Sequence, residues 1–173
     1  MQIRAAVRND LRDIERAAGE QYREFGLHHV ADDEPAPVEV LTRYAEDGRA
    51  WVAVDDSRRP IGYVLVDIVD EGAHVEQVSV LPTHQGQGIG RALIEQVERW
   101  ATSMGFETLT LTTFGHIPWN RPLYEHLGFR VLAEDEIGPG VRRIRDAETD
   151  HGLDPELRVV MRRDMCSAAG SSS

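Results

Sequence analysis

A glycine-rich turn between a predicted strand and a predicted helix carries the residues best suited to chemistry. The turn reads Gln85-Gly86-Gln87-Gly88-Ile89-Gly90-Arg91 and follows Val78-Ser79-Val80. Glycine allows the backbone N–H groups of a turn to point inward. A helix N-terminus adds N–H donors that have no intrahelical acceptor, at the positive end of the helix dipole. The segment therefore predicts an anion site best suited to a diphosphate, and the alternative is a turn that only connects strand and helix.

Two common phosphate-binding motifs do not fit this turn. A Walker A loop requires Lys and then Ser or Thr after its last glycine, whereas Gly90 is followed by Arg91 and Ala92. A dinucleotide-binding turn needs G-x-G-x-x-G and an acidic residue about 20 positions further on. Here the third glycine comes one position early, and the next predicted strand, residues 109–113, ends without an acid. These mismatches disfavour the alternative that the protein binds another nucleotide diphosphate.

The turn needs a strand before it and a helix after it, and the surrounding patterns supply both. Runs of Val, Ile and aromatic residues predict strands at residues 50–55, 61–69 and 73–81, joined by short turns as in an antiparallel meander. Apolar spacing predicts the other elements. They are strands at residues 2–7, 109–113, 129–133 and 157–161, and helices at residues 11–25, 38–46, 89–104 and 119–127.

The order of these elements, β-α-α-β-β-β-α-β-α-β-β, predicts a mixed α/β fold. We expect one central mixed sheet of about seven strands with flanking helices. A single domain is predicted over residues 1–165, followed by a disordered tail over residues 166–173. A polar segment, residues 28–37, is expected to separate the first two helices. The charged segment 134–156 is expected to be a long connection that acts as a functional flap or is mobile.

Two motifs of the chain resemble those of the GNAT N-acetyltransferases. Gln85-x-x-Gly88-x-Gly90, preceded by Val80-x-Pro82, resembles the acyl-CoA signature of that family, and Leu123-Tyr124-Glu125-x-x-Gly128-Phe129 resembles its second landmark. The order of elements is similar to the GNAT fold over residues 1 to about 163. One position departs from the pattern. Many family members carry Asn seven residues before the tyrosine to hold the pantetheine arm, and Ile117 stands there, while Asn120 lies nearer to Tyr124.

The resemblance implies that the protein uses acetyl-CoA as co-substrate and needs no metal. In the family the thioester lies in a gap between two splayed parallel strands, which are residues 73–81 and 109–113 here. A free strand N–H near Val78 would then stabilise the oxyanion. The residues expected to hold the cofactor are Val78, Val80, Gln85, Gly86, Gln87, Gly88, Ile89, Gly90, Arg91 and Asn120.

Direct attack of an amine on the thioester also needs a general acid and a general base. By resemblance Tyr124 is the acid, because a phenol of pKa about 10 can protonate a thiolate whose thiol has a pKa of about 8.5. An amine of pKa about 10.4 must lose a proton before it attacks. Glu76 is the predicted base, and His74, His116 or water remain alternatives. The structural alternatives are a core aromatic at Tyr124 and a solvated strand carboxylate at Glu76.

Charge and composition exclude several classes of partner. Lys plus Arg number 19 and Asp plus Glu number 30 among 173 residues, so the net charge is −11. This balance disfavours nucleic acid and anionic membrane surfaces. One cysteine, Cys166, excludes an internal disulfide or a zinc cluster. The N-terminus has no signal-peptide core, and no apolar run reaches the ~20 residues of a membrane span, so we expect a cytoplasmic protein.

The sequence thus predicts an enzyme that moves an acetyl group from acetyl-CoA to a primary amine. The acceptor is expected to be a small-molecule amine, with a lean toward a cationic one, because acidic residues crowd two segments. These are Asp32-Asp33-Glu34 and Glu134-Asp135-Glu136, for which a solvated acidic surface is the alternative. Other open readings are a non-catalytic acyl-CoA-binding or sensing module, another acyl-CoA as donor, and a protein amine as acceptor. A homodimer is also left open.

Overall fold

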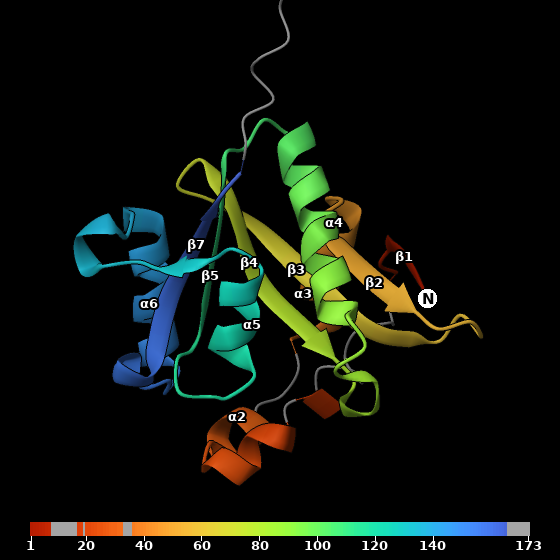
Figure 1. Ribbon diagram of the computed structural model, residues 1–173, viewed down its shortest axis with the longest axis horizontal. Helices are drawn as coiled ribbons and strands as arrows, with labels where there is room; N and C mark the ends of the chain where they lie inside the picture. The colour runs from red at the N-terminus through yellow and green to blue at the C-terminus, as the bar shows by residue number, and fades with distance from the viewer. Residues whose placement is uncertain (8–16, 19, 33–35, 166–173) are drawn as a thin grey trace, which may run out of the picture. The chain divides into compact units, whose positions relative to one another are not determined.

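The computed structural model describes residues 1–7, 17–18, 20–32 and 36–165 (Figure 1). Its strands are β1 (Gln2–Ala5), β2 (Ala50–Val54), β3 (Pro60–Val69), β4 (Gly72–Val80), β5 (Thr108–Phe114), β6 (Arg130–Val131) and β7 (Arg158–Asp164). Its α-helices are α2 (His28–Asp32), α3 (Val38–Glu46), α4 (Ile89–Ser103), α5 (Asn120–His126) and α6 (Pro139–Asp150). Short 3-10 helices are η1 (Gln21–Phe25), η2 (Pro82–His84), η3 (Glu134–Glu136) and η4 (Pro155–Leu157).

The strands form one mixed sheet in the order β1-β2-β3-β4-β5-β7-β6. Strands β1 and β2 and strands β2 and β3 pair antiparallel, as do β5 with β7 and β6 with β7. Strand β4 pairs parallel with β5. The predicted mixed α/β fold with about seven strands and flanking helices is therefore confirmed.

Most predicted elements are present with ends shifted by a few residues, and two predictions are wrong. The polar segment 28–37 contains the short helix α2, and the segment 134–156 contains the three-turn helix α6. The predicted helix 11–25 lies largely outside the described residues, and its end forms η1. The predicted tail 166–173 also lies outside them. No helix in the described ranges combines the length and the apolar character needed to cross a bilayer.

The chain forms two compact units, and β3, β4 and α4 each contribute to both. One unit comprises Met1–Val66 and Glu76–Val97, and the other comprises Asp67–Val75 and Glu98–Ser173. The core of the first unit includes Leu41 of α3, Val52 of β2 and Tyr63 of β3, all at most 2% exposed. A single domain over residues 1–165 stays a prediction.

Glycine at position 62 allows helix α4 to lie close to strand β3 in the first unit. A Cβ at Gly62 would lie 3.1 Å from Ile89 Cγ2 and 3.0 Å from the carbonyl oxygen of Ser79. Ile89, the first residue of α4, is 3% exposed. The start of α4 is therefore packed against the sheet. This packing fixes the position of the helix N-terminus that follows the glycine-rich turn.

Helix α6 belongs to the second unit and is part of its core. Val141 of α6 packs with Ile137, Leu132 and Val160, and Val69 at the end of β3 lies against this cluster. Pro139 occupies the first turn of the helix, where its missing N–H costs no hydrogen bond. The segment is therefore an ordered helical wall of the unit, and the prediction of a flap is wrong.

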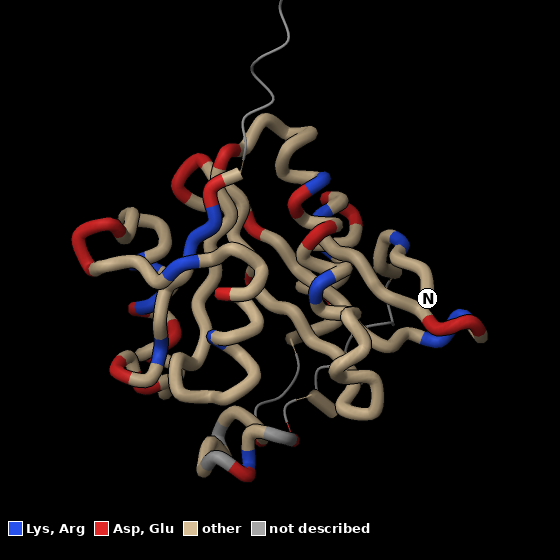
Figure 2. Tube along the Cα trace, viewed as in Figure 1, with Lys and Arg blue, Asp and Glu red and all other residues tan. Residues whose placement is uncertain are grey.

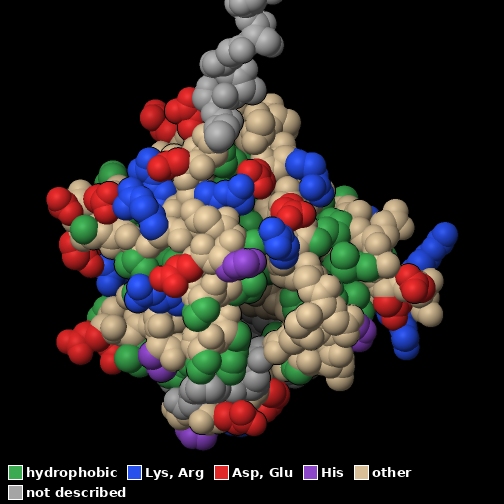
Figure 3. Space-filling view, in the orientation of Figure 1, with side chains coloured by type: hydrophobic (Ala, Val, Ile, Leu, Met, Phe, Trp, Pro, Cys, Tyr) green, Lys and Arg blue, Asp and Glu red, His purple; other side chains and the backbone are tan. Residues whose placement is uncertain are grey.

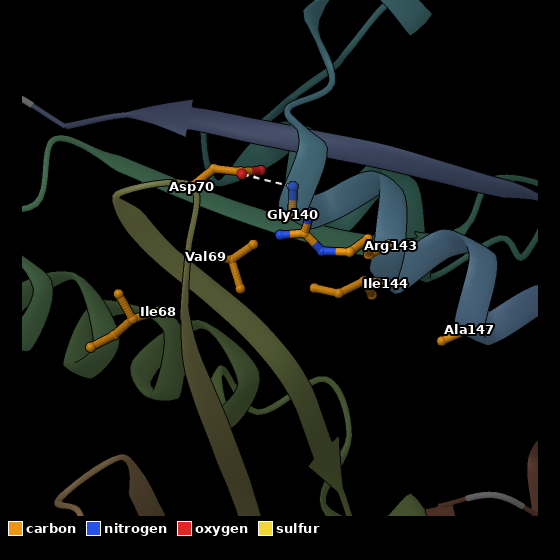
Figure 4. Close-up of a pocket in the computed structure, with 7 residues that line it drawn as sticks. All are labelled: Ile68, Val69, Asp70, Gly140, Arg143, Ile144 and Ala147. Atoms are coloured by element: carbon orange, nitrogen blue, oxygen red, sulfur yellow. Dashed lines mark hydrogen bonds between the residues drawn. The ribbon is translucent and has the colours of Figure 1, made fainter.

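The turn between β3 and β4 caps the N-terminus of α6 (Figure 4). The Asp70 carboxylate accepts hydrogen bonds from the backbone N–H of Gly140 at 2.7 Å and of Val141 at 3.0 Å. Asp70 thereby satisfies two of the N–H groups that have no acceptor within a helix. Gly140 permits this approach, because a Cβ there would lie 2.6 Å from Val69 Cγ1.

Asp70→Ala is expected to lower the free energy of unfolding by about 1–2 kcal/mol, because the first turn of α6 loses both acceptors. Asp70 also has a positive φ of 51°, which alanine adopts less readily. Glu71→Ala, at φ 60° in the same turn, is the control for that strain. Urea denaturation of both variants measures the difference, and an equal loss in the two would argue against the capping role.

Candidate active site

The predicted anion-binding turn has the backbone conformation that glycine permits. Gly86 and Gly88 adopt positive φ angles of 75° and 78° between the end of β4 and the start of α4. A Cβ at either position would meet no atom within 4 Å. Glycine is therefore favoured here by the left-handed backbone and not by crowding.

The turn leads directly into the free N–H groups of helix α4. The first intrahelical hydrogen bond runs from the N–H of Ala92 to the carbonyl oxygen of Gly88 at 3.0 Å. The N–H groups of Ile89, Gly90 and Arg91 precede that bond, so they have no acceptor within the helix. Strand, turn and helix N-terminus thus occur in the predicted order, an arrangement suited to an anion, and the anion site itself stays a prediction.

The side chains predicted to hold the cofactor differ in how accessible they are. Residues 85–88 and Arg91 are exposed, and Arg91 pairs with Glu95 at 3.1 Å. Val78, Val80 and Gly90 are half-buried. The side chain of Ile89 is buried in the core of the first unit, so only its backbone N–H is left for a ligand.

Strands β4 and β5 are paired over only part of their lengths. The registered pairs are Ala73–Leu109, His74–Thr110 and Val75–Leu111. Beyond them β4 continues to Val80 and β5 to Phe114. The pairing thus stops where the sequence predicts that two parallel strands separate. Val78, whose N–H is the predicted oxyanion donor, lies beyond the last of these pairs.

Tyr124 and Asn120 both lie on α5 in the second unit. Tyr124 is 8% exposed, and its ring packs edge-on against Phe129 with 5.9 Å between the ring centroids. Asn120 is the first residue of α5 and is half-buried. Ile117, which replaces the family's asparagine, is fully buried at 0% exposure and serves the core. The roles of Tyr124 and Asn120 stay predictions.

Burial separates the three candidate bases. His74 is 1% exposed, and its Nδ1 lies 2.8 Å from Thr110 Oγ1. Burial lowers its pKa from 6.5 to about 4, although the negative charges of Asp67 and Glu148 raise it. His74 is therefore a neutral core histidine at pH 7. Glu76 is exposed, as is His116, whose ring packs edge-on against another aromatic ring, so both remain reachable by water.

His74 is expected to make the protein less stable in acid. The folded protein protonates it only near pH 4, whereas the unfolded chain does so near pH 6.5, so stability falls as the pH drops from 6.5 to 4. The loss from this group at pH 5 is about 2 kcal/mol. His74→Gln should lose less stability than the wild type between pH 7 and pH 5 in urea unfolding. The exposed His116→Gln is the control, and equal losses for wild type and His74→Gln would contradict the assignment.

The first acidic segment is partly neutralised within the chain. Arg23 donates hydrogen bonds to Asp32 and, at 2.7 Å, to Glu20. The guanidinium lowers the pKa of Asp32 below its ordinary value. Asp33 and Glu34 lie outside the described residues. The charge of Asp32 is therefore already engaged by a cation of this chain.

The second acidic segment is also paired. Arg145 contacts Glu134 at 2.6 Å, and Arg130 forms a bidentate pair with Glu136 at 2.9 and 3.0 Å. Both carboxyl pKa values are lowered, first of all by these hydrogen bonds. Figure 2 shows basic and acidic residues interleaved along α6 and β7, and Figure 3 shows both signs intermixed on the visible face. Attraction of a cationic amine by these two segments therefore receives little support from the structure.

One polar cluster was not predicted from the sequence. It joins Thr112 of β5, Glu148 of α6 and Arg158 of β7, whose side chains hydrogen-bond to one another. The three residues are far apart in the chain and match no local motif, so no sequence signal indicates the cluster. In the described part of the chain, no group of three or more His, Cys, Asp or Glu side chains gathers as for a metal ion.

Comparison with known proteins identifies a family and several relatives. Residues 9–129 match the family model described as the acetyltransferase (GNAT) family. The chain is 27% identical over 99 residues to the peptidyl-lysine N-acetyltransferase YjaB of Salmonella typhimurium. That match covers 57% of this chain and 62% of the relative, so the chain spans less than two thirds of its length.

Solved structures share the fold at low sequence identity. A GNAT-family acetyltransferase from Staphylococcus aureus superposes with a TM-score of 0.72 at 15% identity, covering 95% of this chain and 99% of the other. The PaiA N-acetyltransferase from Thermoplasma acidophilum, solved in complex with coenzyme A, gives a TM-score of 0.70 at 17% identity, with 94% and 98% covered. These likenesses concern the fold.

Proposed function

Because the chain belongs to the GNAT acetyltransferase family, we propose that it transfers an acetyl group from acetyl-CoA to a primary amine by direct attack. The observation that carries the proposal is the turn at Gly86 and Gly88, whose left-handed backbone leads into the free N–H groups of α4. Backbone N–H groups and a helix dipole hold a diphosphate without a basic surface. The net charge of −11 is therefore compatible with an anionic co-substrate.

The acyl donor supplies a thioester, and the residues of this chain have distinct tasks. Glu76, directly or through a water, takes the proton that the amine loses as its nitrogen attacks the carbonyl carbon. The N–H of Val78 stabilises the oxygen of the tetrahedral intermediate. When the C–S bond breaks, Tyr124 donates its proton to the departing sulfur. The new C–N bond leaves an amide and a free thiol.

The donor is held by residues 85–91 through backbone N–H groups, by Val78 and Val80 on β4, and by Asn120. Ile89 contributes its N–H alone, because its side chain is 3% exposed. Asn120 takes over the role of the family's asparagine, whose position in the motif is occupied by Ile117. The fold of a relative solved with coenzyme A supports this use of acyl-CoA.

The acceptor is a primary amine of either of two classes. The sequence favours a small-molecule amine. Its acidic segments also favour a cationic amine, but Asp32 and Glu134 already pair with arginines of this chain, which weakens that preference. A lysine side chain of a protein is the second candidate, favoured by the relative that is named a peptidyl-lysine N-acetyltransferase. The cytoplasmic location expected from the sequence is compatible with either class of acceptor.

A two-step assay tests the proposal. Acetyl-CoA is expected to raise the unfolding temperature, and ATP and NAD are not. Release of free thiol is then followed with spermidine, tyramine and a lysine-containing peptide whose N-terminus is blocked. The chain contains no lysine, since all 19 residues counted as Lys or Arg are arginine, so acetyl-lysine formed in the assay belongs to the acceptor. Stabilisation by acetyl-CoA without thiol release for any amine would instead indicate an acyl-CoA-binding module.

A further inference from the structure

The hydroxyl of Thr112 is held in one orientation by two charged side chains. Thr112 Oγ1 donates a hydrogen bond to Glu148 Oε1 at 2.5 Å and accepts one from the Arg158 guanidinium at 2.8 Å. Glu148 and Arg158 also pair with each other at 2.9 Å. A hydroxyl has one proton and two lone pairs. Thr112 therefore offers one remaining lone pair and no proton.

The two charged partners are themselves fixed. The Arg158 side chain is 12% exposed, and its Cζ lies 4.6 Å from the centroid of the Phe114 ring. The Glu148 side chain is 18% exposed and projects from α6, whose first turn is capped by Asp70. A polar group oriented in this way acts as a preorganised hydrogen-bond acceptor, because binding costs it little rotational freedom.

Thr112 is the first residue of β5 beyond its registered pairing with β4. The last pair is Val75–Leu111, and the preceding pair is His74–Thr110. Side chains alternate along a strand, so Thr112 shares a face with Thr110 and His74. Glu76 is expected on that face of β4 for the same reason, two residues after His74. In the proposed reaction the amine loses its proton to Glu76, so we expect the amine to approach β4 from this face.

The other two threonines of this face are not available in the same way. The hydroxyl of Thr110 is engaged by the buried ring of His74. Thr108 is the first residue of β5, at the opposite end of the paired segment from Thr112, and its hydroxyl lies close to Gly72. Thr112 is partly exposed and lies past the paired segment. It is therefore the threonine of this face that can meet an incoming group.

We propose that Thr112 Oγ1 accepts a hydrogen bond from an N–H of the acceptor amine, with Glu148 and Arg158 as positioning residues. This inference rests on the proposed acetyl transfer to a primary amine. A neutral primary amine carries two N–H groups and one lone pair. Donation of one N–H to Thr112 orients the nitrogen lone pair for attack on the thioester carbonyl. The second N–H of the amine stays free. Thr112 then acts on the amine and not on the acyl donor.

Thr112→Val tests the role because it removes the hydroxyl and keeps the shape of the side chain. With spermidine, tyramine or the blocked lysine peptide as acceptor, kcat/KM for the amine is expected to fall about tenfold, the value of one hydrogen bond of ~1.4 kcal/mol. The KM for acetyl-CoA should stay unchanged. Thr112→Ser keeps the hydroxyl and should recover activity to within about threefold. Thr108→Val on the same face is the matched control and should behave as wild type.

A second variant tests the positioning by the charged partners. Glu148→Gln keeps an oxygen that can accept from Thr112 but removes the charge that pairs with Arg158. An intermediate fall in kcat/KM for the amine, about threefold, is expected, again without a change in the KM for acetyl-CoA. Circular dichroism and urea unfolding confirm that each variant is folded.

The outcomes separate this inference from the function on which it rests. If the wild type acetylates an amine and Thr112→Val does so equally well, the role of Thr112 is overturned and the proposed function stands. An equal loss in Thr112→Val and Thr112→Ser would also overturn it, because the hydroxyl would not be the cause. A wild type that transfers acetyl to none of the three amines would overturn both.

Discussion

Gly88→Asp is expected to weaken the binding of acetyl-CoA at least a hundredfold in calorimetric titration. Gly88 has a φ of 78°, and the space around its Cβ position is open, so the new carboxylate would project from the turn that is proposed to hold the diphosphate. Like charges about 4 Å apart repel by ~4 kcal/mol at an effective dielectric constant of 20. A hundredfold loss corresponds to ~2.7 kcal/mol and is therefore a modest expectation.

Two further variants separate charge from backbone strain. Gly88→Asn has the same shape as Gly88→Asp without the charge, and both residues tolerate positive φ better than most. We expect Gly88→Asn to lose less than tenfold in affinity. Gly48→Asp places a carboxylate at another exposed glycine of positive φ, 68°, at the end of α3, and should bind acetyl-CoA normally. Similar losses in the Asp and Asn variants at position 88 would contradict an anion site.

Tyr124→Phe is expected to lower kcat about a hundredfold while the dissociation constant for acetyl-CoA changes less than threefold. General acid catalysis commonly contributes a factor of 10² to 10⁴, and the substitution removes only the proton donor. The aromatic packing of the ring against Phe129 is kept. Turnover is measured as thiol release at saturating acetyl-CoA, and affinity by calorimetry on the same preparations.

The pH profile gives a second readout of the same role. If Tyr124 is the acid, the fall in kcat at high pH in the wild type should be lost in Tyr124→Phe. Tyr44→Phe serves as the control, since Tyr44 lies on α3, where the Arg49 guanidinium stacks on its ring. A large loss of acetyl-CoA affinity with unchanged turnover would show that Tyr124 helps to hold the donor and is not the acid.

Much of the sheet could be predicted because its signals are local. Strands β2, β3 and β4 follow from runs of β-branched residues separated by short turns, and each is found within two residues of its predicted ends. Helix α3 and its end before Gly48 follow from apolar spacing and from the need for a positive φ at the C-terminus. These features depend on neighbours in sequence, so the sequence contains what is needed to predict them.

Helix α6 was missed because its stability comes from elsewhere in the fold. The segment Gly138-Pro139-Gly140 has the composition of a loop, and the helix that follows it is rich in charged residues. What stabilises it is the Asp70 carboxylate, 70 residues earlier in the chain, and a hydrophobic cluster that includes Val160 of β7. Propensity is a weak guide where such long-range packing decides the outcome.

The sequence by itself determined the chemistry that is open to this protein. Gly86 and Gly88 stand between a strand and a helix, and Tyr124 follows one strand and one helix later. These features depend on local order along the chain, and they indicated the family. The tertiary structure decided which polar residues are available. It buried His74, paired Asp32 with Arg23, and joined Thr112, Glu148 and Arg158 from three elements. Burial and ion pairing depend on which distant segments pack together, and this packing cannot be predicted from the side-chain types alone.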